Sequence, residues 1–250
     1  MSTRVLGVIL LLFQFPAASA TLDNEWVTAV AKRDLATIER LVTRDVDVNL
    51  ATSKGKTALM LAAQENRLDV MRMLLAAGAG VDVRNTRGGT ALMYAAVIGD
   101  PATIRLLLSH GATINAQSTN GWTALMIAVA KGHDRIVSLL LSEGADPNAH
   151  DIYGWTPLMR GVYENRPGAV GILLRSDQID VNARGDNGAT ALHYAAEKGY
   201  LEIARLLITN NADLRAKDLK GRTPLMVASA QGHKRIADLI NRSLDQEALR

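Results

Sequence analysis

Five methionines are the most regularly spaced residues of this chain that could do chemistry. Each lies three positions after a recurring threonine, and they are Met60, Met93, Met126, Met159 and Met226. His193 takes the same place once. A row of thioethers is a ligand set that soft ions such as Cu(I) prefer. The same spacing also arises where one position of a repeated core is filled, because methionine adapts to irregular gaps. We favour packing and expect no metal and no cofactor.

Other catalytic patterns fail on spacing or composition. None of the five histidines has a second histidine four positions away, so the zinc-binding His-Glu-x-x-His pattern is missing from the sequence. Gly55-Lys56-Thr57 resembles the end of a phosphate-binding loop, but Leu50 stands where that loop needs glycine. The sequence contains no cysteine nucleophile and no Gly-x-Ser-x-Gly. We therefore expect that the protein is not an enzyme.

The threonines that set the methionine spacing show how the chain is organised. Each is followed by alanine or proline and then leucine, and they are Thr57, Thr90, Thr123, Thr156, Thr190 and Thr223. Successive threonines are 33 residues apart, with one interval of 34. A fixed period of this length predicts a stack of identical supersecondary units.

The unit over 118–150 shows the local grammar. Thr123 can cap a short helix that follows it, and Gly132 can end that helix in the left-handed conformation. Apolar residues over 136–141 then predict a second helix, which Gly144 closes. Each unit is therefore expected to be two helices and a turn.

The pattern resembles the ankyrin repeat. The matching segments are GKTALMLAA at 55–63, GTALMYAA at 89–96, GWTALMIAVAKGH at 121–133, GWTPLM at 154–159, GATALHYAAEKGY at 188–200 and GRTPLMVASAQGH at 221–233. The resemblance implies an all-α solenoid in which each unit is a β-turn tip and two antiparallel helices. It also implies that partners meet the tips and the exposed side of the first helices.

Seven units are predicted in a single domain over 21–250. A polar, degenerate unit precedes the six regular ones, as a cap over an open end should. The predicted ranges are near 22–51, 52–84, 85–117, 118–150, 151–184, 185–217 and 218–242, with a tail over 243–250.

Residues 1–20 are typical of a secretory signal peptide. Arg4 precedes an apolar run over 5–15, and Ala18-Ser19-Ala20 has the small-x-small form of a cleavage site. The run is too short to span a bilayer. An exported chain without cysteine favours the bacterial periplasm, with an extracellular location as the alternative.

The charge balance narrows the partners. A net charge of +3 at pH 7, with no clustered lysine and arginine, favours neither nucleic acid nor, after signal cleavage, a membrane. We expect a monomer that binds another protein. The face named by the resemblance carries four aromatic residues, Trp122, Tyr153, Trp155 and Tyr163. Such residues concentrate binding energy, although a tip aromatic can instead pack on the neighbouring turn.

Polar residues of the same face complete the predicted site. They are Arg87, Lys54, Lys56, Asn120, Asn187 and Arg222. The 151–184 unit departs from the pattern, because Arg160 and Gly161 interrupt its first helix. This departure could bend the stack beside the aromatic residues, or it could be drift that the stack tolerates.

The expected function is therefore non-catalytic protein binding. Small exported bacterial ankyrin proteins, which this chain resembles, have been linked to protection of periplasmic enzymes under oxidative stress. The resemblance implies such a protecting or scaffolding role. The alternative is a secreted effector or toxin-neutralising protein that acts on a foreign target.

Overall fold

The computed structural model describes residues 17–44 and 46–248, and in these residues it contains fourteen helices and no strand. The helices are α1 (Ala17–Lys32), α2 (Leu35–Leu41), α3 (Ala58–Gln64), α4 (Leu68–Ala76), α5 (Ala91–Ile98), α6 (Pro101–Ser109), α7 (Ala124–Lys131), α8 (Asp134–Ser142), α9 (Pro157–Tyr163), α10 (Pro167–Leu173), α11 (Ala191–Lys198), α12 (Leu201–Thr209), α13 (Pro224–Ala230) and α14 (Lys234–Ala248).

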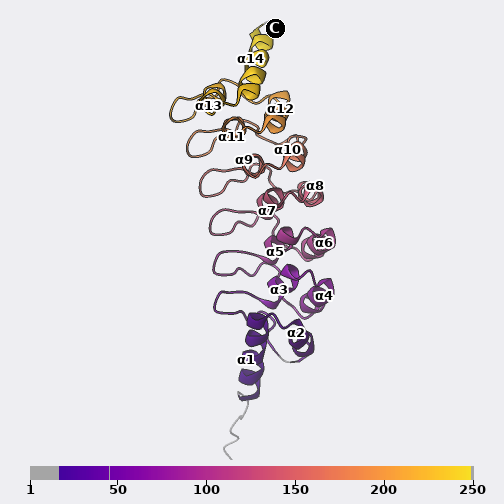
Figure 1. Ribbon diagram of the computed structural model, residues 1–250. Coiled ribbons are helices and arrows are strands. Elements are labelled where there is room, and N and C mark those ends of the chain that lie inside the picture. Colours follow the sequence, from indigo (N-terminus) through magenta and orange to yellow (C-terminus); the bar gives the residue numbers. More distant parts are fainter. Residues whose placement is uncertain (1–16, 45, 249–250) are drawn as a thin grey trace, which may run out of the picture.

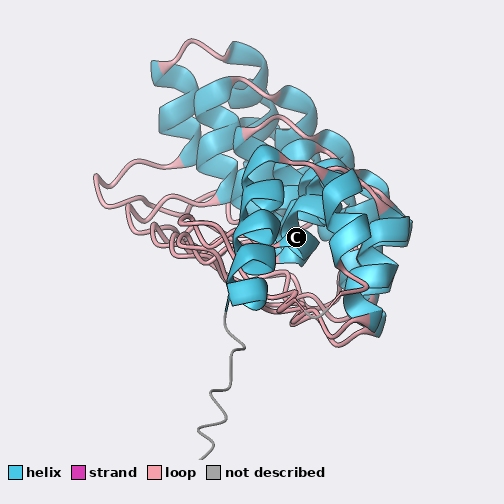
Figure 2. Cartoon of the chain, turned by 90° about the horizontal axis from the view of Figure 1, so that it is seen from below, coloured by secondary structure: helices cyan, strands magenta, loops and turns pink. Residues whose placement is uncertain are grey.

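The helices pair and the pairs stack into a column (Figure 1). From α3 onwards, each first helix contacts the first helix of the next unit, as α3 does α5 and α5 does α7. The second helices, from α2 to α14, do the same in a parallel row. Long loops project from one side of the column as tips (Figure 1). Figure 2, which looks along the column, shows these loops gathered beside the helices. The structure confirms the all-α solenoid of stacked helix pairs that the sequence predicts.

Recurring caps explain where the helices begin and end. The Thr123 side-chain oxygen accepts a hydrogen bond from the Met126 N–H at 3.2 Å, and four other repeat threonines cap in the same way. Gly132 ends α7 with a φ of 73°. Asn66 and Asn165 adopt positive φ at the matching position, as tolerant residues can. These local contacts set the length of each first helix.

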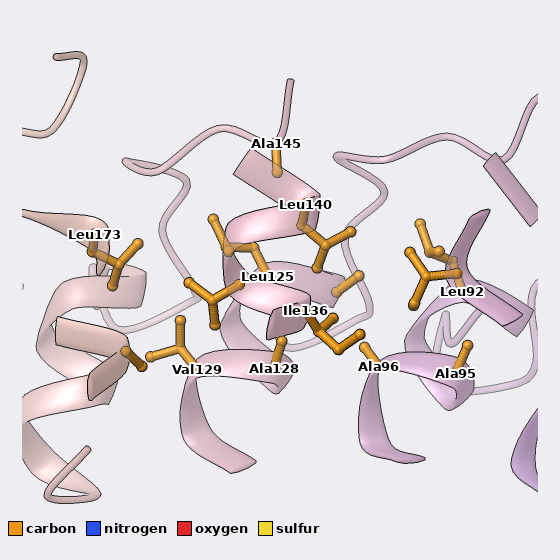
Figure 3. Close-up of a cluster of buried hydrophobic side chains, with 14 of the residues drawn as sticks. Leu92, Ala95, Ala96, Leu125, Ala128, Val129, Ile136, Leu140, Ala145 and Leu173 are labelled. Atoms are coloured by element: carbon orange, nitrogen blue, oxygen red, sulfur yellow. The ribbon is translucent and has the colours of Figure 1, made fainter. Parts of the chain in front are cut away.

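The core runs continuously between units (Figure 3). Leu125, Ala128 and Val129 of α7 lie between Leu92 of α5 and Leu173 of α10, and all five are fully buried or nearly so. The alanines let neighbouring helices approach closely. Each buried leucine stabilises the stack by roughly 1.5–3 kcal/mol.

The methionine row is part of this core, with one exception. Met60, Met93, Met126 and Met159 are buried, which confirms packing for these four. Met226 is 56% exposed, so the expectation of a buried position is wrong there. Its helix α13 is the last first helix of the described stack, and no further unit covers it.

His193, which takes the methionine position in its unit, is held in place by hydrogen bonds. Its Nδ1 accepts from the Thr190 N–H at 3.1 Å, and its Nε2 lies 2.9 Å from the Arg222 carbonyl oxygen. Burial lowers the pKa of this imidazole, which favours the neutral form that both contacts use. The histidine thus ties the 185–217 unit to the next tip.

Both ends of the stack are helical. The helix α14 passes the predicted end of the last unit at Arg242 and continues to Ala248, where Glu247 forms an ion pair with Arg215. The helix α1 begins at Ala17, and residues 1–16 of the predicted signal peptide lie outside the described residues. Within the described part of the chain, no helix has the length and apolar character needed to cross a membrane.

Candidate functional site

The tips are joined by a ladder of backbone hydrogen bonds. At one position of each tip, the carbonyl oxygen accepts a hydrogen bond from an N–H of the next tip. The residues at this position are Lys54, Arg87, Asn120, Tyr153 and Asn187. The N···O distances lie between 2.9 and 3.2 Å. The spacing between tips is tight, since a Cβ on Gly121 would lie 2.6 Å from the Asp151 Cα. Half of the predicted site therefore stands on one fixed row, which we call the tip row.

Two further rows run beside the tip row. The residue before each capping threonine forms one row, which is Lys56, Gly89, Trp122, Trp155, Ala189 and Arg222. The fourth residue after each threonine forms the other, which is Leu61, Tyr94, Ile127, Arg160, Tyr194 and Val227. Because the units repeat, the chemistry of the face is read from these three rows together.

Arg160 lies between two tryptophans. Its guanidinium carbon is 4.7 Å from the Trp122 ring centroid and 4.5 Å from that of Trp155. A guanidinium at this distance is attracted to a ring face. The Arg160 side chain is only 15% exposed, and its Nε has no hydrogen-bond partner among the described residues. The residue that interrupts the sequence pattern is thus the centre of a cation–aromatic sandwich.

Asp151 neutralises this arginine and shapes the tip. Its Oδ2 pairs with Arg160 Nη2, and its side chain is fully buried. Its Oδ1 accepts from the Tyr153 N–H at 2.9 Å and from the Trp155 N–H at 3.0 Å. One carboxylate therefore satisfies both the turn and the buried cation, which a buried ion pair requires.

The sandwich continues into the next unit. Trp155 meets Tyr163 edge-on, with ring centroids 5.1 Å apart, and lies 4.6 Å from the ring of Tyr194. The Lys198 ammonium is 4.6 Å from the Tyr163 ring centroid. We call Trp122, Arg160, Trp155, Tyr163 and Tyr194 the aromatic stack. Trp155 packs on neighbouring side chains, which is the alternative to partner binding that the sequence left open for a tip aromatic. It nevertheless remains part of the face.

Exposed apolar side chains flank the aromatic stack. Ile152 and Tyr153 are 57% and 60% exposed, and Tyr163 is 40% exposed. A hollow of about 430 Å³ lies here, lined by Tyr153, Trp155, Arg160, Tyr163, Asp186 and Asn187. Four of the predicted site residues, Tyr153, Trp155, Tyr163 and Asn187, therefore share one hollow.

A second group of predicted residues forms a basic cleft nearer the N-terminus. Lys54, Lys56 and Arg87 line a hollow of about 450 Å³ together with Asn85, Thr86 and Tyr94. The Lys56 ammonium donates to Gln64 Oε1 at 2.5 Å and lies 5.3 Å from the Tyr94 ring centroid. Burial lowers the pKa of Lys56, and the positive charge of Arg33 adds to the effect.

A third hollow joins the basic cleft to the aromatic stack. Its volume is about 490 Å³, and its lining includes Gly89, Tyr94, Val97, Trp122 and Ile127. Gly89 lines it, and Lys56 and Trp122 hold the same repeat position in the two neighbouring units. We call it the Gly89 hollow. Arg87, Asn120 and Trp122 of the predicted site line it.

Arg222 is the one predicted residue that the structure places apart from these hollows. Its Nε donates to Asp218 Oδ2 at 2.8 Å, and its carbonyl accepts from His193. The residues that sequence reasoning did not select are Asp151, Arg160, Tyr94 and Tyr194. The signal that could have found the last three is their shared place four residues after the capping threonine.

Comparison with known proteins defines the class. The stacked helix pairs and the ladder of tips make this a helical repeat solenoid. A family model for ankyrin repeats in three copies matches residues 26–118, 99–185 and 178–248. The chain therefore belongs to the ankyrin repeat family, whose repeats are non-catalytic modules that bind other proteins.

A solved structure agrees with this assignment. The ankyrin repeat domain of Bcl-3, described as a unique member of the IkappaB protein family, is similar with a TM-score of 0.75 and 33% sequence identity. The similarity covers 87% of this chain and 97% of that domain. No curated protein matches the chain. Among the described residues, no group of three or more acidic or histidine side chains is arranged to hold a metal ion.

Proposed function

We propose that this chain is a non-catalytic protein-binding module of the bacterial periplasm that protects or scaffolds a partner enzyme. The proposed contact surface comprises the tip row, the aromatic stack and the hollows between them. The observation that carries the proposal is the aromatic stack, which holds large rings in place before any partner arrives.

Preorganisation is what makes these rings suited to binding. A ring fixed by Arg160 and by its neighbours loses little conformational freedom when a partner covers it. Tyrosine and tryptophan are also enriched among residues that dominate interface energy. Ile152 and Tyr153 place exposed apolar area directly beside this rigid base.

The ionisable groups of the face support a non-catalytic role. Asp151 and Arg160 neutralise each other, and both ring nitrogens of His193 contact main-chain atoms. A general acid or base needs a proton that can reach a substrate. These groups instead hold one unit against the next.

The location in the periplasm rests on residues 1–20 and on the lack of cysteine in the sequence. Osmotic-shock fractionation of a bacterium that expresses the full chain tests it. We expect the protein in the periplasmic fraction with Thr21 as its first residue. Recovery of the unprocessed chain with the cytoplasmic fraction would overturn this part of the proposal.

Substitution of the exposed tip tests the contact surface. The variant Ile152→Ser with Tyr153→Ser removes exposed apolar area without touching Trp122 or Trp155. Leu219→Ser with Lys220→Ser is the matched control, because Leu219 is 78% exposed at the equivalent position of the last tip.

Each variant is immobilised, and proteins from periplasmic extract that it retains are quantified against wild type. We expect the Ile152/Tyr153 variant to bind the main partner at least about tenfold more weakly, which corresponds to about 1.4 kcal/mol. The control should bind as wild type does. Equal retention by wild type and the Ile152/Tyr153 variant would reject this surface.

A further inference from the structure

The cations of the basic cleft are unpaired. Among the described residues, no carboxylate forms an ion pair with Lys54, Lys56 or Arg87. Glu65, the C-cap residue of the helix α3 that follows Lys56, is already paired with Arg33. Lys56 is half-buried, and the neutral Gln64 amide is the side-chain hydrogen-bond partner of its ammonium, with the uncharged Tyr94 ring 5.3 Å away. A cation that is partly removed from water, with no carboxylate in direct contact, favours the arrival of an anion.

The cleft opens directly into an apolar hollow. Asn85, Arg87 and Tyr94 line both the basic cleft and the Gly89 hollow, so the two are continuous. The Asn85 amide donates to the Tyr94 hydroxyl at 3.0 Å, and this hydrogen bond fixes the Tyr94 ring between the basic cleft and the Gly89 hollow. An occupant could therefore place negative charge on one side of Tyr94 and an apolar side chain on the other.

The basic row is too short for a nucleic-acid backbone. Beyond Arg87 the tip row continues with Asn120, Tyr153 and Asn187, and none of these is a cation. A phosphodiester chain carries a charge at every residue and gains affinity from each phosphate that is neutralised. A polypeptide can place carboxylates at the cleft alone and apolar side chains beyond it. The arrangement favours a polypeptide.

We propose that the basic cleft and the Gly89 hollow bind an acidic segment of a partner protein, with carboxylates against Lys54, Lys56 and Arg87 and a large apolar side chain in the hollow. This inference rests on the proposed function and names the chemistry of the partner. The Gly89 hollow, at about 490 Å³, is large enough for an aromatic or branched aliphatic side chain.

Selection from a random library of twelve-residue peptides on the full chain tests the proposal. We expect enriched peptides to carry an excess of aspartate and glutamate and at least one large apolar residue. The dissociation constant of the most enriched peptide is then measured by fluorescence anisotropy for wild type and for two triple variants.

The test variant is Lys54→Gln, Lys56→Gln and Arg87→Gln. The matched control removes the same charge from three exposed lysines elsewhere, as Lys217→Gln, Lys220→Gln and Lys234→Gln. We expect at least tenfold weaker binding to the test variant and less than twofold weakening for the control. For the wild-type chain, peptide affinity should also fall as salt is added, because added ions screen the attraction between exposed charges.

Four outcomes separate this inference from the proposed function. Acidic peptides that need the three cations support it. Enriched peptides without acidic excess that need Ile152 and Tyr153 overturn it and leave the proposed function standing. A library with no enrichment over the bare support overturns both. Binding of a twelve-nucleotide single strand that is tighter than the best peptide, and is lost in the test variant, overturns it in favour of nucleic acid.

Discussion

The aromatic stack and the basic cleft use positive charge in opposite ways. In the stack, Arg160 is buried between two rings and neutralised by Asp151. In the cleft, Lys54, Lys56 and Arg87 have no carboxylate partner among the described residues. The same rows of the repeat supply both regions, so the difference comes from which residue stands at each position. The charge of Arg160 is neutralised inside the protein and stabilises it, whereas the unpaired charges of the basic cleft remain available to a partner.

The largest expected effect comes from removing the carboxylate of the aromatic stack. Asp151→Ala leaves Arg160 buried without a counter-charge and deletes two hydrogen bonds to the tip. We expect a loss of about 3–5 kcal/mol in the free energy of unfolding. Urea denaturation followed by tryptophan fluorescence measures this loss, because Trp122 and Trp155 lie in the affected region.

Asp218→Ala is the matched control for this prediction. Asp218 accepts the same pair of turn hydrogen bonds, but its partner Arg222 is half exposed. We expect a smaller loss of about 1 kcal/mol. Adding Arg160→Leu to Asp151→Ala should recover part of the larger loss, since it removes the stranded cation. Equal losses for the two aspartates, with no recovery, would mean that the buried arginine is not what distinguishes the regions.

A second substitution separates shape from charge in the stack. Arg160→Lys keeps the ion pair with Asp151 but replaces a planar group that lies against two rings. We expect a loss of about 1–2 kcal/mol in the free energy of unfolding. Arg166→Lys is the control, because the Arg166 Nε donates to the Ala130 carbonyl at 3.0 Å and the guanidinium lies over no aromatic ring of the described residues. A larger loss at Arg166 would argue that the rings contribute little.

The repeat pattern made most of the fold predictable, but it did not indicate the aromatic stack. Threonine caps and turn glycines act within one unit, so Thr123 and Gly132 could be placed from the sequence. Arg160 looked like a defect because its value depends on Trp122, 38 positions earlier in the chain, and on a buried carboxylate. Met226 failed for the opposite reason, since its burial depended on a neighbour that the last unit does not have.

The candidate site was predictable as a surface but not as separate regions. Placing the tip residues on one face required only the period. Their division into a basic cleft, the Gly89 hollow and the aromatic stack depends on which residue each unit places at the repeated positions and on ring contacts across units. Whether the 151–184 unit bends the column stays a prediction, because the contacts at Arg160 explain its departure from the pattern without a bend.

Removing a charged side chain from the basic cleft should cost less folding stability than removing one from the aromatic stack. Lys56→Gln removes a cation that already lacks a carboxylate partner, so little stabilising energy is lost. We expect the free energy of unfolding to change by less than about 0.5 kcal/mol. Urea denaturation beside Asp151→Ala gives a direct comparison. A loss above about 2 kcal/mol would show that this lysine stabilises the fold and would remove the contrast between the regions.

The smallest effect, and the most specific to the cleft, is the pH dependence of Lys56. Burial lowers its pKa in the folded protein below the ordinary 10.5, and Arg33 adds to this. The folded chain therefore binds fewer protons than the unfolded chain between the lowered pKa and 10.5. The free energy of unfolding therefore rises with pH through that window, relative to a Lys56→Met variant. Below the window, the cost of burying charged Lys56 persists.

NMR titration of ¹³Cε-labelled lysine measures the pKa of Lys56 directly. An acidic peptide bound in the cleft should raise it again, because a nearby carboxylate favours the ammonium form. An inflection at or above 10.5 in the free protein would mean that Lys56 is no more desolvated than an ordinary surface lysine, and that the cleft holds no cation in need of a partner.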